Sequence, residues 1–117
     1  MKTLVGLWII VQAQMMGKDM TAQFAAQSLE MTESSYVVRS GEAITDSGRL
    51  HFFEDANHLD IIGEEGPIKG QLLRTIFKYE NDQLIICYNL QPDGVRPENF
   101  TATPENQFLL LTYTRKK

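Results

Sequence analysis

The chain has 117 residues, of which 43% are hydrophobic and 22% charged, as is typical of a single globular domain spanning residues 1–117 and not of a disordered chain. Its net charge of −4 argues against a nucleic-acid partner, because such a partner requires a basic surface and the sequence has one basic cluster, the terminal Arg115-Lys116-Lys117. No apolar run reaches the roughly 18 residues of a membrane span, so no membrane partner is expected.

The first predicted element is a strand over residues 5–15, in the stretch TLVGLWIIVQAQ. An export signal and an apolar helix are the competing interpretations. The single Lys2 is a weak basic region for a signal peptide and the cleavage signal is poor, so we expect a cytoplasmic location. Because side chains alternate along a strand, Trp8, Ile10 and Gln12 are predicted to face inward. The opposite face is apolar and leaves homodimerisation as a hypothesis; it comprises Leu7, Ile9, Val11 and Ala13.

A short helix of one or two turns is predicted within residues 17–27, GKDMTAQFAAQ. Asp19 or Thr21 is the expected N-cap, and Met20 and Phe24 have the i, i+4 spacing of one helical face. Two roles are open for this segment: an adaptable apolar lid over a ligand, or a plug that completes the core.

Short runs of β-branched and aromatic residues, separated by turn residues, predict further strands. Asn81-Asp82 lies between two such runs and predicts a tight hairpin turn. The remaining strands are expected at 28–33, 35–40, 44–53, 58–63, 71–80, 83–90 and 107–115.

Eight sequential antiparallel strands must form either a barrel or a two-sheet sandwich. In a meander, the short connections would gather at one end and the long ones at the other, which suits a cup with a closed base and an open mouth. The sequence therefore predicts an all-β, eight-stranded up-and-down barrel with one short helix after the first strand.

Candidate chemistry is sparse. The segment HFFEDANHLD brings together histidines and carboxylates, but its spacing matches no metal motif, and acidic residues between strands are ordinary turn chemistry. Cys87 lies in an apolar run and is expected to behave as a small buried hydrophobe, and a single cysteine allows no internal disulfide. The histidines and carboxylates of that segment are His51, Glu54, Asp55, His58 and Asp60.

Arg96 lies in a predicted 16-residue connection, 91–106, longer than compact domains usually contain. Its guanidinium would suit a carboxylate ligand at the mouth. The alternative is that Arg96 pairs with Glu98, Glu105 or a loop carbonyl and only fixes the loop.

With eight strands proposed, Gly6-x-Trp8 on the first strand and Arg115 at the end of the last resemble the lipocalin (calycin) signature. That resemblance implies that Trp8 plugs the barrel base and that Arg115 packs across its indole ring.

A closer resemblance covers nearly the whole chain: it looks like a lipocalin-like domain of uncharacterised bacterial proteins, many from planctomycetes. The resemblance rests on LVGLWIIVQAQMMGKDM, GQLLRTIFKYENDQLIICYN, RPENF and a terminal LLTYTR. It implies a fold and no established activity.

The leading functional prediction is a non-enzymatic barrel that binds a small, largely apolar ligand, with no cofactor and no metal. Ile10, Gln12, Met20, Phe24 and Arg96 are the expected ligand-binding residues. The alternative is a protein-interaction or inhibitor-type module with a filled barrel, acting through loops 64–70 and 91–106. An enzyme ranks third, because no nucleophile arrangement or glycine-rich phosphate loop is present.

Overall fold

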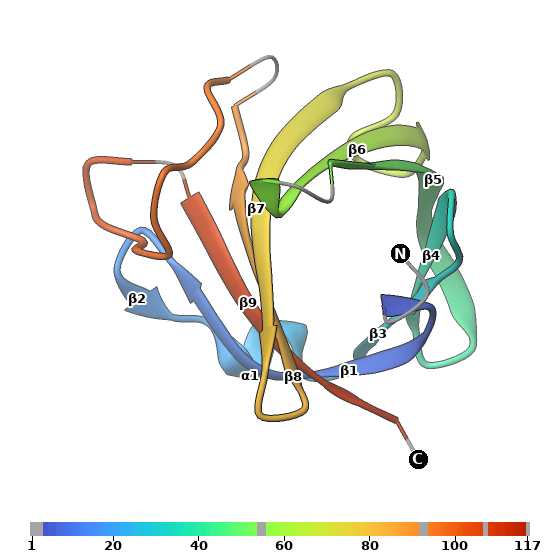
Figure 1. Cartoon of the computed structure of the whole chain (residues 1–117). Coiled ribbons are helices and arrows are strands. Elements are labelled where there is room, and N and C mark those ends of the chain that lie inside the picture. Colours follow the sequence, from blue (N-terminus) through green and yellow to red (C-terminus); the bar gives the residue numbers. More distant parts are fainter. Residues whose placement is uncertain (1–3, 54–55, 92–93, 107, 117) are drawn as a thin grey trace.

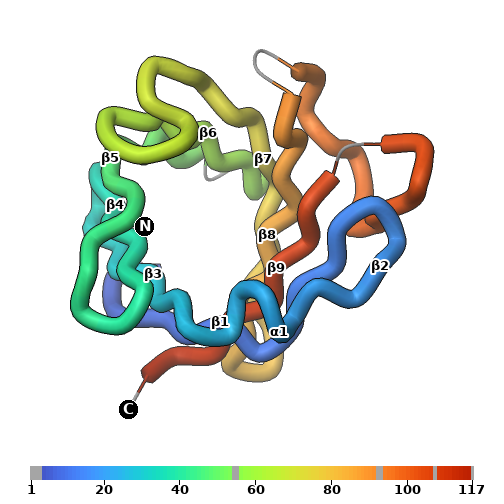
Figure 2. The backbone as a smooth tube through the Cα atoms, turned by 180° about the vertical axis from the view of Figure 1, so that it is seen from behind, coloured from blue at the N-terminus to red at the C-terminus, as the bar shows by residue number. Residues whose placement is uncertain are grey.

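The computed structural model describes residues 4–53, 56–91, 94–106 and 108–116, and its strands close into an antiparallel barrel (Figure 1). The sheet order is β2-β1-β3-β4-β5-β6-β7-β8-β9, and β1 also pairs with β9, which completes the ring seen from behind in Figure 2. Eight strands of this nine-stranded sheet form the ring, as predicted, while β2 pairs only with the end of β1. The elements are β1 (Gly6–Met15), β2 (Lys18–Asp19), α1 (Thr21–Phe24), β3 (Gln27–Met31), β4 (Ser35–Ser40), β5 (Ala43–Phe53), β6 (His58–Glu65), β7 (Leu72–Glu80), β8 (Gln83–Asn89) and β9 (Phe108–Arg115).

The connections segregate between the two ends of the barrel, as predicted. The β3–β4 and β7–β8 turns, together with the end of β5 and the start of β6, share one end with the start of β1, which is the closed base. The β7–β8 turn holds Asn81 and Asp82 at φ angles of 52° and 61°. Positive φ at both central residues is the type I′ geometry that matches the twist of a hairpin, so this prediction is confirmed.

Strand β1 contains a bulge that reverses its side-chain alternation. Ile10 and Gln12 lie opposite consecutive residues of β9, so Val11 is an extra residue in β1. Trp8 on one side of the bulge and Ala13 on the other are both fully buried, whereas Gln12 is exposed. The predictions of an inward Gln12 and an outward Ala13 were therefore wrong, because one inserted residue moves every later side chain to the opposite face.

The outer face of β1 keeps a shorter apolar stripe than the sequence predicts. Ile9 is 38% exposed and Val11 is 42% exposed, while Leu7 is half-buried. Homodimerisation through this stripe stays a prediction.

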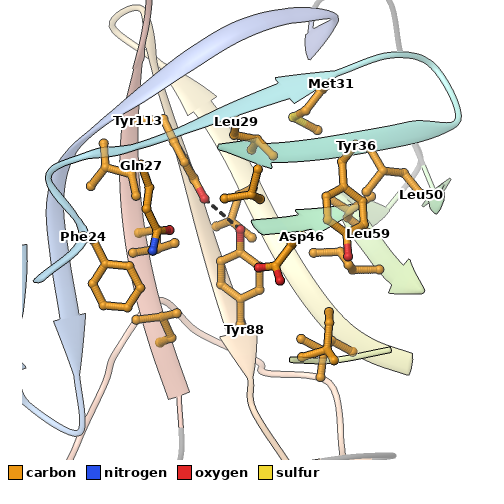
Figure 3. A pocket seen from close by; sticks show the side chains of 18 of the residues that line it. Phe24, Gln27, Leu29, Met31, Tyr36, Asp46, Leu50, Leu59, Tyr88 and Tyr113 are labelled. Carbon is orange, nitrogen blue, oxygen red and sulfur yellow. Dashed lines mark hydrogen bonds between the residues drawn. The ribbon is translucent and has the colours of Figure 1, made fainter. Parts of the chain in front are cut away.

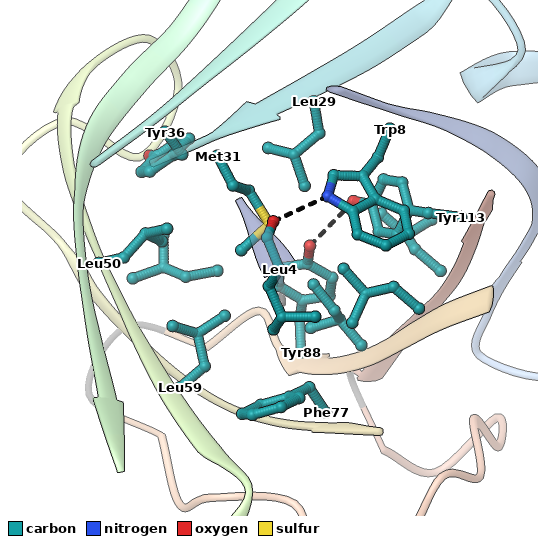
Figure 4. Close-up of a cluster of buried hydrophobic side chains, with 14 of the residues drawn as sticks. Leu4, Trp8, Leu29, Met31, Tyr36, Leu50, Leu59, Phe77, Tyr88 and Tyr113 are labelled. Carbon is teal, nitrogen blue, oxygen red and sulfur yellow. Dashed lines mark hydrogen bonds between the residues drawn. The ribbon is translucent and has the colours of Figure 1, made fainter. Parts of the chain in front are cut away.

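Trp8 fills the base of the barrel (Figure 4). It is fully buried, its indole Nε1 donates a hydrogen bond of 3.0 Å to the carbonyl of Leu4, and Leu4 is itself buried against it. The Tyr79 ring meets the indole edge-on at 6.0 Å. The guanidinium carbon of Arg115 lies 4.2 Å from the indole centroid, which confirms the predicted contact between Trp8 and Arg115.

Gly6 makes that contact sterically feasible. Its φ of 144° is unfavourable for other residues, and a Cβ there would lie 2.5 Å from Nη1 of Arg115. The same Nη1 donates a 2.8 Å hydrogen bond to the carbonyl of Val5. The start of β1 and the end of β9 are thus joined through one arginine.

The described part of the connection between β8 and β9, residues 94–106, packs on the outer wall of the barrel instead of over its mouth. Arg74 of β7 donates a hydrogen bond of 3.1 Å to the carbonyl of Gly94, and the amide of Asn89 donates one of 2.9 Å to the carbonyl of Val95. Further along, Lys78 lies 4.8 Å from the Phe100 ring centroid. Figure 1 shows this segment, in orange, running outside β7 and β8.

The predicted helix is a single turn, α1, that packs beside β1. Its N-cap is Met20, with no side-chain capping bond, so Asp19 and Thr21 were wrong as caps. Asp19 instead accepts hydrogen bonds from the backbone N–H and the hydroxyl of Thr21. Thr21 Oγ1 in turn accepts the backbone N–H of Ala13, which fixes the turn against β1.

No helix in the described part of the chain combines the length and apolar character of a membrane span.

Candidate functional site

A cavity of about 150 Å³ lies inside the barrel, above the plug formed by Trp8 and Leu4 (Figure 3). Its wall is mostly aliphatic, with side chains from β3 to β9 alternating into it. At the open end it is bordered by Phe24 of α1, Ile68 of the β6–β7 connection and Leu90. An apolar cavity of this size accommodates a molecule about as large as benzene.

The structure brings together only part of the predicted ligand-binding set. Ile10 and Phe24 line the cavity. Met20 packs against the core without lining it, and the bulge turns Gln12 out to solvent.

Arg96 was expected at the mouth, but it lies on the outside of the barrel. Its Nη2 forms a 2.6 Å ion pair with Asp60 of β6, and its Nη1 donates a 2.8 Å hydrogen bond to the carbonyl of Thr75 in β7. The guanidinium carbon also lies 5.5 Å from the Phe53 ring centroid. Arg96 therefore fixes the β8–β9 connection to the wall, and its ion-pair partner is Asp60 instead of the expected Glu98 or Glu105.

One polar feature of the cavity is a pair of side chains that sequence reasoning missed, Asp46 of β5 and Tyr36 of β4 (Figure 3). Asp46 Oδ1 and the Tyr36 hydroxyl are both buried, and neither has a hydrogen-bond partner among the described residues. Burial raises the pKa of Asp46. Burial, together with the negative charges of Asp46 and Glu64, raises the pKa of Tyr36 to about 12.

Two glycines leave room for this pair. Gly48 lies opposite Tyr36, and a Cβ there would be 2.9 Å from the ring. Gly66 has a φ of 99°, and a Cβ there would collide with Asp46 Oδ1. The lack of a side chain at both positions therefore leaves room for the carboxylate and the phenol.

A signal for Asp46 is present in the sequence. Asp46 is an even number of residues from Leu50 and Phe52, so all three side chains lie on one face of the strand. The apolar character of Leu50 and Phe52 identifies that face as the inward one. An aspartate on the inward face is expected to be buried, whereas the polar composition around Asp46 alone suggests that its side chain is exposed.

Tyr88 and Tyr113 form a second polar pair in the same cavity, with their hydroxyl oxygens 3.0 Å apart. Both are buried, and burial raises the pKa of each of them well above its ordinary value. Because each hydroxyl has the other as a partner, this pair has less need of a ligand than Asp46 and Tyr36.

These tyrosines predict alkaline unfolding. In the unfolded chain tyrosine ionises near pH 10, whereas the folded protein holds the Tyr36 proton until about pH 12. Their stabilisation is therefore complete below about pH 10, and the free energy of unfolding should fall as pH rises from there through about 12. Urea unfolding at pH 8, 10 and 11 measures the fall. Tyr36→Phe should reduce its slope, and an unchanged slope would contradict the assignment to Tyr36.

The histidine and carboxylate segment forms no metal site within the described ranges. No group of three or more His, Cys, Asp or Glu side chains there is placed to hold a metal ion. Asp60 pairs with Arg96, and the His51 ring packs against Phe53 at 4.6 Å. Glu54 and Asp55 lie outside the described residues.

Cys87 is fully buried and alternates with Ile86 and Tyr88, which line the cavity, so it faces away from the cavity. Burial raises the pKa of its thiol to about 11, which suits the predicted role of a small hydrophobe.

Compared with descriptions of known protein families, with curated proteins and with solved structures, the chain matches none of them.

Proposed function

We propose that this chain is a non-enzymatic binding protein, and that its barrel takes up one small, largely apolar molecule at the open end. The observation that carries the proposal is the cavity of about 150 Å³. Largely apolar pockets with a few placed polar groups are the usual form of a small-molecule site. A lipocalin-like assignment, a bacterial origin and a cytoplasmic location belong to the same proposal and rest on the sequence.

The alternative, a filled barrel that acts through loops 64–70 and 91–106, has less support. A filled barrel would leave no internal space for a ligand. The 91–106 loop is fixed to the outer wall by Arg96, and Ile68 of the other loop points into the cavity.

The test is a titration with toluene that is monitored by the backbone NMR chemical shifts of the protein. We expect saturable shifts around Ile10, Phe24 and Leu111, three residues of the cavity wall. Val38 lines the cavity, so Val38→Phe should fill it and weaken toluene binding at least tenfold.

Val37→Phe is the matched control, because Val37 is the neighbour of Val38 on β4 and does not line the cavity. It should leave toluene binding unchanged within about twofold. Shifts absent from the cavity wall up to the solubility limit of toluene would refute the proposed function.

A further inference from the structure

We propose that the cavity selects a compact hydrophobic amine, whose ammonium group lies against Asp46 while its hydrocarbon part fills the apolar space. This inference rests on the proposed function and adds the chemical class of the ligand.

The charge of the cavity is the first argument. Asp46 is the only side chain among the described lining residues that can carry a full charge near neutral pH, and no described lysine or arginine lines the space. No ion pair with a described residue compensates the carboxylate, and its Oδ1 is buried with no hydrogen-bond partner in the described part of the chain. Oδ1 itself packs against Gly66, so a ligand in the cavity meets the part of the Asp46 side chain that lines the space, and a cation there offsets its buried negative charge.

The surroundings of Asp46 favour a cation over a neutral donor. Tyr36 lies close enough for the charge of Asp46 to act on its hydroxyl, and Glu64 adds a second negative charge near the same hydroxyl. The rings of Tyr36 and Tyr88 line the same space (Figure 3). Aromatic rings attract a cation that lies over their faces. Carboxylate and aromatic faces together are complementary to an ammonium group and repel an anion.

The volume limits the rest of the ligand. A space of about 150 Å³ takes a single six-membered ring or a short branched chain, not a fatty acid. Most of the wall is aliphatic and includes Leu29, Leu59 and Leu111. One end of the ligand is therefore expected to be charged and the other apolar.

Four probes with one ring and one small substituent separate these contributions: benzylamine, benzyl alcohol, toluene and benzoate. Calorimetric titration near neutral pH should show benzylamine binding at least tenfold more tightly than toluene, with benzoate weakest. In the wild-type protein, benzylamine should also shift the Asp46 and Tyr36 signals more than toluene does, a readout that requires no variant.

Asp46→Asn keeps the shape and removes the charge. It should bring benzylamine to within about twofold of toluene and leave toluene itself unchanged. Glu80→Gln is the control, because Glu80 is paired with Lys78, is exposed and does not line the cavity, and it should leave all four affinities unchanged within about twofold.

The outcomes distinguish the two proposals. If none of the probes binds the wild-type protein, both the proposed function and this inference fail. If toluene or benzyl alcohol binds as tightly as benzylamine, or if Asp46→Asn leaves the preference intact, the amine inference alone is overturned.

Discussion

Replacing Trp8 with alanine should lower the free energy of unfolding by about 3–5 kcal/mol, the range for deleting a fully buried large aromatic side chain. The indole fills the base of the barrel, and its Nε1 donates to the Leu4 carbonyl. Its loss also removes the surface on which Arg115 and the Tyr79 ring pack. Urea unfolding followed by circular dichroism measures the change.

Ile9→Ala is the control, because Ile9 is adjacent on β1 but faces outward and is 38% exposed. It should cost about 1 kcal/mol. Equal costs for the two substitutions would show that Trp8 is not a structural plug. Toluene binding to the folded fraction of the Trp8 variant should persist, because Trp8 does not line the cavity.

Arg96→Ala should cost about 2–3 kcal/mol of stability. Arg96 and Asp60 form a 2.6 Å ion pair whose side chains are only 20% and 16% exposed, and Arg96 also bonds the Thr75 carbonyl. The substitution leaves Asp60 poorly solvated and releases the β8–β9 connection from the wall. Urea unfolding gives the cost, and limited proteolysis within residues 94–106 should become faster.

The Arg49–Glu64 pair provides the comparison. Its side chains are 63% and 53% exposed, so Arg49→Ala should cost less than about 1 kcal/mol. A double-mutant cycle on Arg96 and Asp60 should give a coupling energy above about 1 kcal/mol. A coupling energy below about 1 kcal/mol, which is the range for exposed ion pairs, would contradict the role assigned to Arg96.

The barrel could be predicted because its determinants are local. Alternating β-type runs and turn residues place all eight ring strands within a few residues of their observed positions. The turn at Asn81-Asp82 follows from the tolerance of both residues for positive φ. The contact of Trp8 with Arg115 was predicted from a family resemblance. The up-and-down topology placed both residues at the same end of the barrel.

The site was harder to predict because it depends on register and on long-range packing. Nothing local marks the bulge at Val11, yet it moves Gln12 from the predicted cavity wall to the surface. The partner of Arg96 is 36 residues away, so no spacing rule reveals it. Asp46 lines the cavity because of the face of β5 on which it lies, and that face is fixed by the register between β4 and β5.

The hydrogen bond from Arg115 to the Val5 carbonyl joins residues 110 positions apart in the chain. Forming a contact between residues so far apart lowers the conformational entropy of the unfolded chain by a large amount. The β7–β8 hairpin loses less entropy, because its loop has two residues. Folding should therefore begin in local hairpins, and the seam between β1 and β9 should form last. The rate of folding is then set by closure of the ring, on the slow timescale typical of β topologies rich in non-local pairs.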